Sequence, residues 1–442
     1  MRQFAARRVA RPLLLCLPTA LLAGASGCVF TTDSEHGFHF QIGTSSRGTL
    51  GHQAAEERRL RLDLVSGDQL VLEGMVADVE LRAGGRDRGD LVAMVRADGR
   101  TQEEAETALQ EVGVEVVRDG SVVTVRVQSD PRTLELSGGG VLITSARADL
   151  SAALPPDVRV LIREASGEIE VAGPVAGVEA HTAYGDVSVS RIVGRTVISS
   201  GSGDLSVRDA RDGDVSATTN FGDVVLADVQ AGSVEVESSS GDVELRKVDA
   251  TRIRVRSSFG GLDLERLSGD VDAETASGDV DLSDGANARY RLHSNFGQVT
   301  VERVSGEVRA TSDSGEVEVA CDGIVEARSR FGRVRVEGVL RAVDAASDSG
   351  DVLVIALPGS RAERDWSATS GFGEVVLRIA SDFACRIDAR TEFGDVDDEF
   401  ELVHRDEGST SIAGGPVGGG GEGAKRVVLH TGSGDIEILR RD

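Results

Sequence analysis

Phe221-Gly222-Asp223-Val224 and, 19 residues later, Ser240-Gly241-Asp242-Val243 are two copies of the unit that decides the fold of this chain of 442 residues. The unit consists of an aromatic residue or serine, a glycine, usually an acid, and an aliphatic residue. It occurs fourteen times, mostly at spacings of 18 or 19 residues, and its central glycines are Gly167, Gly185, Gly203, Gly222, Gly241, Gly260, Gly278, Gly297, Gly315, Gly332, Gly350, Gly373, Gly394 and Gly434. A fixed period of this size is typical of a solenoid, in which each unit buries its apolar side against its neighbours.

Each unit has the pattern of two short strands joined by corners. After Gly222, apolar Val224 and Leu226, and later Val234 and Val236, alternate with polar residues. This period of two is expected of half-buried strands and excludes a helix. The central glycine suits a corner because it reaches positive φ at little steric cost, and the acid that follows it in eleven of the fourteen units can bond to a nearby backbone N–H.

The residue before the central glycine alternates between serine and an aromatic residue, in the order Ser166, Tyr184, Ser202, Phe221, Ser240, Phe259, Ser277, Phe296, Ser314, Phe331, Ser349 and Phe372. Strand parity places these residues on the face of Val234 and Val236, so the rings are predicted to point inward. If one unit makes one coil, a ring stacks over a serine. If two units, about 37 residues, make one coil, each ring stacks on an identical ring about 4.8 Å away.

The strict alternation favours the coil of two units, and duplication of a two-unit block is the competing explanation. An exposed aromatic strip for stacking sugars is the functional alternative, and the predicted inward direction of the rings speaks against it.

The chain is strongly acidic, with 74 Asp and Glu residues against 48 Lys and Arg residues and a formal net charge of −26. Nucleic acid is therefore excluded as a partner, because phosphate binding needs clustered positive charge. Two local basic stripes interrupt the acidic body, and we expect them to balance stacked carboxylates, with a docking patch as the alternative. They comprise Arg252, Arg254 and Arg256, and then Arg328, Arg330, Arg333 and Arg335.

Residues 1–27 have the layout of an export signal peptide, since arginines precede an apolar run from Leu13 to Ala23 that is too short to span a membrane. Ala25-Ser26-Gly27-Cys28 resembles a bacterial lipoprotein signal. The resemblance implies lipidation of Cys28, a lipid-anchored tether over residues 28–57, and a place in the bacterial cell envelope. We expect an outer-membrane lipoprotein that faces the periplasm or the cell surface.

Residues 58–165 predict a mixed α/β cap with one short helix. Thr101 and Glu104 form a capping box, and an apolar face follows at Ala105, Ala108, Leu109 and Val112. Asp119-Gly120 predicts a hairpin between two alternating runs. Such a segment can cover the open end of a solenoid, whose unpaired strand edge would otherwise add other chains.

This order of elements carries a family resemblance. The helix and the hairpin lead through Leu154-Pro155-Pro156-Asp157-Val158 into Ala165-Ser166-Gly167-Glu168-Ile169 and the train of glycine units. Over roughly residues 60–395 and again in the last strand pair, the chain resembles the bacterial "putative adhesin" family of uncharacterised exported β-helix proteins. The resemblance implies a right-handed parallel β-helix and supplies no catalytic residues.

The regular repeats over residues 166–396 give way to wider spacings of 23, 21 and 40 residues. Residues 397–425 are acidic and rich in glycine, so they predict a surface loop. Residues 426–442 resume the alternation and predict final solenoid strands that complete the last sheet.

The residues favour no metal, cofactor or catalytic site. One carboxylate at each corner is too few for calcium unless the corners stack in register, because calcium binds six to eight oxygens. Cys321 and Cys385 lie 64 residues apart, beyond the expected reach of a disulfide, and are interpreted as small buried apolar residues.

A regular ladder of identical groups suits multivalent weak binding, so the sequence favours a non-catalytic envelope solenoid with an adhesin-like or scaffold surface. Its expected partners are the membrane, through the lipid anchor, and envelope proteins or polysaccharide. A polysaccharide-active β-helix enzyme and a structural spacer without a ligand are the alternatives.

Overall fold

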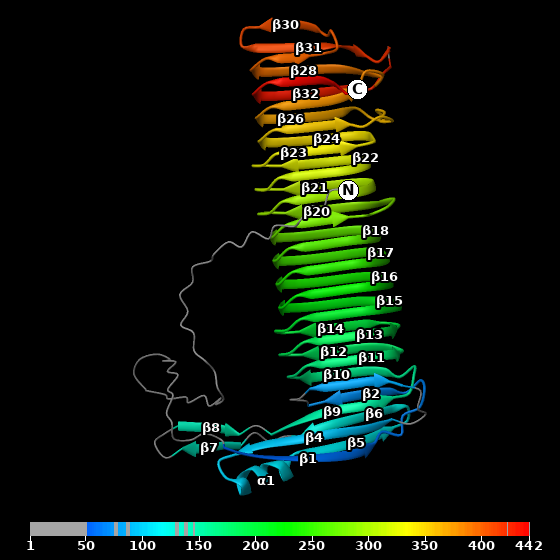
Figure 1. Cartoon of the computed structure of the whole chain (residues 1–442), viewed down its shortest axis with the longest axis vertical. Helices are drawn as coiled ribbons and strands as arrows, with labels where there is room; N and C mark the ends of the chain where they lie inside the picture. The colour runs from blue at the N-terminus through cyan, green and yellow to red at the C-terminus, as the bar shows by residue number, and fades with distance from the viewer. Residues whose placement is uncertain are drawn as a thin grey trace, which may run out of the picture. The chain divides into compact units, whose positions relative to one another are not determined.

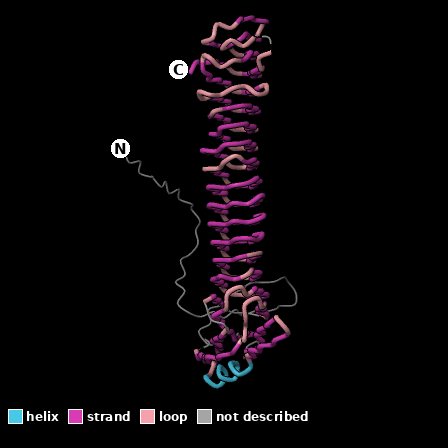
Figure 2. Tube along the Cα trace, turned by 90° about the vertical axis from the view of Figure 1, so that its right-hand side faces the viewer, coloured by secondary structure: helices cyan, strands magenta, loops and turns pink. Residues whose placement is uncertain are grey.

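The computed structural model describes residues 51–74, 78–84, 89–128, 132–136, 140–144, 146–421 and 423–441. The chain divides into two compact units. One comprises Met1–Ala54, Arg96–Glu111 and Asp130–Ala146, and the other, which contains the repeats, comprises Ala55–Val95, Val112–Ser129 and Arg147–Asp442. The second unit is a parallel β-solenoid whose rungs follow one another from β10 onward in Figure 1 and are seen after a quarter turn in Figure 2.

One sequence unit makes one rung. The long strands β15 (Leu205–Phe221), β16 (Val224–Ser240), β17 (Val243–Phe259) and β18 (Leu262–Ser277) each turn a corner half-way and run parallel to the next. Val224 pairs with Val243, one unit later. The coil of about 37 residues is therefore wrong. Two short strands return the chain to its start because their facing aliphatic side chains already fill the narrow interior.

The rungs build two sheets. The first contains the second halves of the long strands, of β21 (Val299–Ser312) and of β22 (Val317–Ser329), together with β10 (Arg159–Ala165), β12 (Gly177–Thr182), β14 (Thr196–Ser200), β20 (Ala288–Ser294), β24 (Leu340–Ser349) and β26 (Trp366–Phe372). The second contains the first halves, together with β11 (Ile169–Val175), β13 (Val187–Val193), β19 (Val280–Ser283), β23 (Val334–Gly338), β25 (Val352–Ala356) and β27 (Val375–Ala380).

The core lies between these two sheets and consists mostly of Val, Leu, Ile and Ala. Val224, Val243 and Val280 are fully or almost fully buried, as the alternation predicts. Trp366 closes part of the interior beside Phe383, with ring centroids 4.9 Å apart. The all-β solenoid expected from the repeat is thus confirmed.

Residues of the expected cap form a mixed segment. It contains β1 (His52–Arg61), β4 (Asp90–Gly99), α1 (Gln102–Glu111), β5 (Gly113–Asp119), β6 (Val122–Gln128), the antiparallel pair β7 (Arg132–Leu136) and β8 (Gly140–Thr144), and β9 (Ala146–Leu154). At the start of α1, the backbone N–H of Glu104 donates to the Thr101 hydroxyl at 3.2 Å, as the capping box predicts. The hairpin β5–β6 turns at Gly120.

Two strands of this region belong to the solenoid itself. β2 (Gln69–Glu73) runs parallel between β6 and β10, and β3 (Val79–Ala83) runs parallel between β9 and β11, so they make a rung. β1 begins at His52, inside the range expected to be a tether. The long-range parallel pairing of residues 69–83 has no counterpart in the local sequence pattern.

The C-terminal strands return into the stack. β32 (Arg426–Ser433) lies between β26 and β28 (Cys385–Phe393), and β33 (Ile436–Arg441) lies between β27 and β29 (Val396–Asp398). The last strands of the chain therefore form the rung before the one made by β28 and β29.

Residues 397–425, expected to be a surface loop, contain the antiparallel hairpin of β30 (Val403–Glu407) and β31 (Thr410–Val417). β31 also pairs antiparallel with β28. Alternate residues Ser411 and Ala413 are buried, so a short alternating run inside a polar, glycine-rich segment was enough to make a strand.

Candidate functional site

Seven aromatic rings stand exposed at the corners of the solenoid. The prediction that the rings point inward is wrong, because each is between 63% and 70% exposed. We call this set the ring ladder: Tyr184, Phe221, Phe259, Phe296, Phe331, Phe372 and Phe393.

The corner itself turns the rings outward. In β15 the alternation ends at Thr219, which is buried, and Asn220 and Phe221 are both exposed. The backbone is already turning toward Gly222 there, so parity counted along the strand no longer applies. An asparagine before the ring and a glycine after it were the local signal for a corner that the sequence interpretation missed.

Serines separate the rings in space. Ser240 pairs with Phe221 on one side and with Phe259 on the other, and Phe259 in turn pairs with Ser277. The rings therefore occupy every second rung, about 9.6 Å apart if strands are spaced by about 4.8 Å.

The alternation follows the folded surface rather than the order of the chain. Phe372 and Phe393 belong to consecutive units of the sequence. The returning strand β32 inserts Ser433 between them, so that Ser433 pairs with both rings. Duplication of a two-unit block alone does not account for this placement.

A column of buried hydroxyls stiffens the same corner. The hydroxyl of Ser294, fully buried, donates to the carbonyl oxygen of Gly278 in the neighbouring rung at 2.8 Å. The same bond to a corner glycine is made by Ser200, Thr219, Thr275, Ser312, Ser329, Ser347, Ser370, Thr391 and Thr431. The ring ladder therefore stands on a backbone that is hydrogen-bonded from rung to rung.

The corner acids form a second column beside the rings. The carboxylate of Asp204 accepts a hydrogen bond from the backbone N–H of Asp223 at 2.8 Å, and Asp223 accepts one from Asp242 at 2.8 Å. These bonds confirm that the acids satisfy backbone donors. Among the residues that the structure describes, no group of three or more His, Cys, Asp or Glu side chains is placed to hold a metal ion.

A polar groove of about 440 Å³ accompanies the ring ladder on the first sheet. Its lining includes Asn220, Ser239 and Ser258, each of which directly precedes a corner residue of the ladder or its serines, together with Glu237 and Arg256. Hydroxyl, amide and charged groups thus lie close to the exposed rings.

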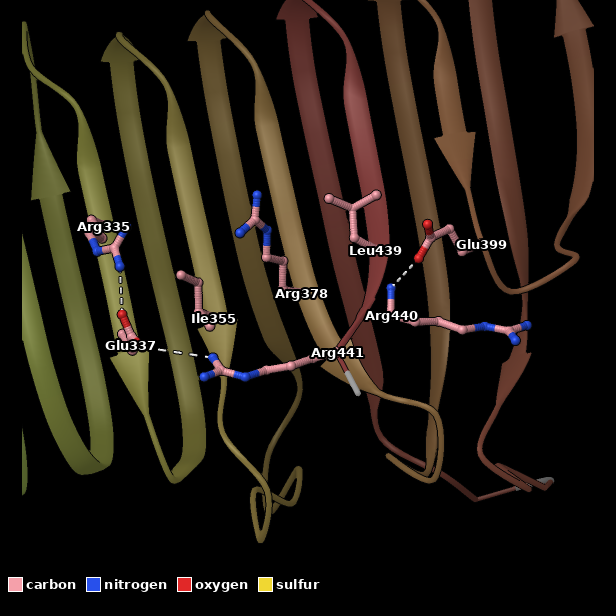
Figure 3. Close-up of a pocket in the computed structure, with 8 residues that line it drawn as sticks. All are labelled: Arg335, Glu337, Ile355, Arg378, Glu399, Leu439, Arg440 and Arg441. Atoms are coloured by element: carbon pink, nitrogen blue, oxygen red, sulfur yellow. Dashed lines mark hydrogen bonds and ion pairs between the residues drawn. The ribbon is translucent and has the colours of Figure 1, made fainter.

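A second cavity, of about 470 Å³, lies on the outside of the second sheet near the C-terminus (Figure 3). The guanidinium of Arg335 donates to Glu337 at 2.6 Å, and Arg441 lies 3.7 Å from the same carboxylate. The backbone N–H of Arg440 donates to Glu399 at 2.6 Å. The remaining lining residues are Ile355, Arg378 and Leu439. Two of its four guanidinium groups therefore already share one carboxylate.

The basic stripes balance carboxylates, as expected. Arg254 lies 3.9 Å from Glu235 in one neighbouring rung and 3.7 Å from Asp272 in the other. Further pairs of this kind, at up to 3.8 Å, join Arg256 to Glu237, Arg328 to Asp344, Arg330 to Asp313, Arg333 to Glu316 and Arg335 to Glu318.

Cys321 and Cys385 are buried free thiols, which agrees with their interpretation as small apolar residues. Burial raises the pKa of each thiol to about 12. Cys28, the expected lipidation site, lies outside the described residues, as does the signal segment 1–27. In the part of the chain that the structure describes, no helix is both long and apolar enough to cross a bilayer.

Residues 195–330 match the model of the protein family described as Toastrack DUF4097. No curated protein matches the chain.

Several solved structures are similar to the chain. A "putative cell adhesion protein" from Clostridium sporogenes is 10% identical over 88% of this chain and 100% of its own, with a TM-score of 0.17. A "putative adhesin" from Bacteroides fragilis is 12% identical over 69% and 97%, with a TM-score of 0.20. A "putative lipid binding protein" from Parabacteroides distasonis is 13% identical over 69% and 94%, with a TM-score of 0.22. TM-scores of this size carry no weight for function. The regular centre of the ring ladder, within residues 195–330, is therefore a Toastrack segment.

Proposed function

We propose that the protein is an exported, non-catalytic solenoid of the cell envelope that acts as an adhesin-like surface through many weak contacts. The observation that carries the proposal is the repetition of one exposed group, an aromatic ring, on every second rung. When identical groups are held on one rigid body, the second and later contacts form at high effective concentration, so weak contacts add to a firm attachment.

The column of corner carboxylates also favours binding over catalysis. Glycosidases of the common type need two carboxyl groups placed across a scissile bond, with one kept protonated. The corner carboxylates of Asp204 and Asp223 instead accept hydrogen bonds from the backbone of the next rung. Release of reducing ends from acidic polysaccharides by the purified protein would favour the alternative of a polysaccharide-active enzyme.

The proposal is tested with the purified full chain, immobilised on beads at low and high density and mixed with envelope extract and with whole cells. We expect retention to rise more steeply than density, because attachment depends on several contacts at once. A variant with three rings replaced by serine should be retained much less. If nothing binds at either density and deletion of the protein weakens the envelope, the spacer alternative replaces this function.

We also propose that Cys28 carries a lipid anchor that holds the solenoid at the membrane. The proposal rests on the signal-like segment that ends at Cys28. Cells fed labelled palmitate should label the wild-type protein and leave a Cys28→Ala variant unlabelled. Equal labelling of both proteins, or of neither, would reject the anchor while leaving the binding surface untouched.

A further inference from the structure

We propose that the ring ladder is a binding track for an extended, uncharged β-1,4-linked glycan strand that lies along the solenoid axis. This inference rests on the proposed function and names its class of ligand. The track comprises the seven rings and the polar groove beside Phe221 and Phe259.

The first step is the chemistry of the exposed rings. A pyranose sugar with equatorial hydroxyls has an apolar face of C–H groups, and aromatic rings bind such a face because they combine a large apolar area with a negative π surface. Each ring of the ladder is more than three-fifths exposed and is followed along the axis by a small serine. A sugar can therefore reach the ring without displacing any side chain of a neighbouring rung.

The second step is the period. Rings on alternate rungs stand about 9.6 Å apart. This distance is close to the length of one disaccharide in an extended β-1,4-linked glycan, in which successive sugars turn over and equivalent faces recur with every second sugar. An extended peptide repeats its side chains every two residues, about 6.6–6.8 Å, and falls out of step with the rings within two repeats.

The third step is the polar groove. Its lining offers the Asn220 amide and the hydroxyls of Ser239 and Ser258, with Glu237 and Arg256 beside them. These groups supply both donors and acceptors, which suits the hydroxyl groups at the edges of a sugar. Apolar surfaces joined by a few convergent polar groups are the usual composition of a small-molecule site.

Charge decides between the remaining occupants. A formal net charge of −26 and the column of corner acids beside the rings disfavour a polyanionic glycan. They also disfavour a second copy of this chain, and the rings, each separated by a serine, offer no continuous apolar patch of the kind found at the centre of a stable dimer. An uncharged glycan meets neither objection.

The fourth step is the maintenance of the period at the C-terminal end. Without Ser433 of the returning strand, Phe372 and Phe393 would lie on adjacent rungs. The inserted serine restores the two-rung interval there. A merely apolar edge would not require this interval, whereas a ligand with its own period does.

The test uses the purified full chain and isothermal titration with chito-oligosaccharides and cello-oligosaccharides from dimer to octamer. We expect affinity to rise with each added disaccharide in at least one of the two series. Malto-oligosaccharides of the same lengths are the control, because their α-linked chains curve and cannot keep pace with a straight ladder. Failure of both β-linked series to bind, or equal binding of the malto-oligosaccharides, would overturn the inference.

Two variants connect binding to the rings. Replacing Phe221, Phe259 and Phe296 together by serine should weaken binding of the longest oligosaccharide about tenfold or more. Serine already occupies this corner position in alternate rungs, so the fold should tolerate the change, and an unchanged melting temperature checks that it does. A variant with leucine at the same three positions keeps apolar groups and should lose most of the same affinity.

The matched variant tests the period itself. Combining Phe259→Ser with Ser277→Phe keeps the number of rings and moves one ring by a single rung. We expect it to bind long oligosaccharides as weakly as Phe259→Ser alone, whereas an unspecific apolar edge would bind them as well as the wild type does, which would refute the glycan track. Dissociation of a dimer by ring removal, seen in sedimentation, would identify a second copy as the occupant instead. If the three-ring variant loses envelope binding although no glycan binds, the proposed function stands and this inference fails.

Discussion

Substitution of one corner glycine should destabilise the solenoid far more than substitution of a glycine elsewhere in the same rung. Gly241 has a φ of +144°, and a Cβ atom there would lie 2.0 Å from the carbonyl oxygen of Gly222 and 2.5 Å from its carbonyl carbon. Alanine at this position must leave its conformation or push two backbones apart. Backbone strain of this kind costs about 1–3 kcal/mol.

Separating the rungs would also weaken two hydrogen bonds. The N–H of Gly241 donates to Phe259 at 3.0 Å, and the N–H of Gly222 donates to Ser240 at 2.9 Å. With about 0.5–1.5 kcal/mol for each bond and the strain above, we expect Gly241→Ala to lower the free energy of unfolding by about 2–6 kcal/mol.

Gly232 provides the matched control. A Cβ atom there would meet only the carboxylate oxygen of Asp214, at 2.9 Å, at the end of a flexible side chain. We expect Gly232→Ala to change the free energy of unfolding by less than about 1 kcal/mol in either direction. Urea unfolding followed by the strand signal in circular dichroism measures both variants, and equal midpoints for Gly241→Ala and Gly232→Ala would refute the stacking of glycine on glycine.

Three further outcomes follow from buried groups. Ser294→Ala should lower the free energy of unfolding by about 1 kcal/mol, measured by the same urea titration, because the carbonyl of Gly278 loses its donor. Burial first, and then the nearby carboxylate of Glu437, raises the pKa of Glu374, so the folded protein loses stability as pH rises through that raised pKa. Melting curves should therefore find Glu374→Gln more stable than the wild type at neutral pH, with the difference vanishing below the ordinary glutamate pKa. Cys321, whose pKa is raised to about 12, should react with a maleimide at neutral pH only after the protein is unfolded, and fast labelling of the folded protein would contradict its burial.

The rung could be predicted from the sequence because its determinants are local. A glycine that recurs every 18 or 19 residues fixes the corners, and the alternation from Val224 onward fixes which side chains enter the core. The bond from the corner acid to a backbone N–H could also be predicted, since it needs only an acid beside a turn.

Features that depend on closure could not be predicted in the same way. A period gives the length of the repeat but not the number of repeats in one coil, so the alternation of Ser240 and Phe259 was compatible with both coils. The direction of Phe221 depended on whether the corner begins before or after it, and strand parity contains no information on that point. The insertions of β2, β3, β32 and β33 into the stack depend on pairing between distant residues, which no local pattern records.

The C-terminal return connects folding to the proposed binding. A solenoid that simply ended after β27 would expose a strand edge, and the hairpin β30–β31 can cover that edge without any returning strand. The chain nevertheless returns to place β32 and β33 inside the stack. Its effect on the surface is one additional serine between Phe372 and Phe393. Because the cap alone satisfies the edge, the inserted rung is better explained by the spacing of the rings, and that spacing is the property which a periodic ligand would read.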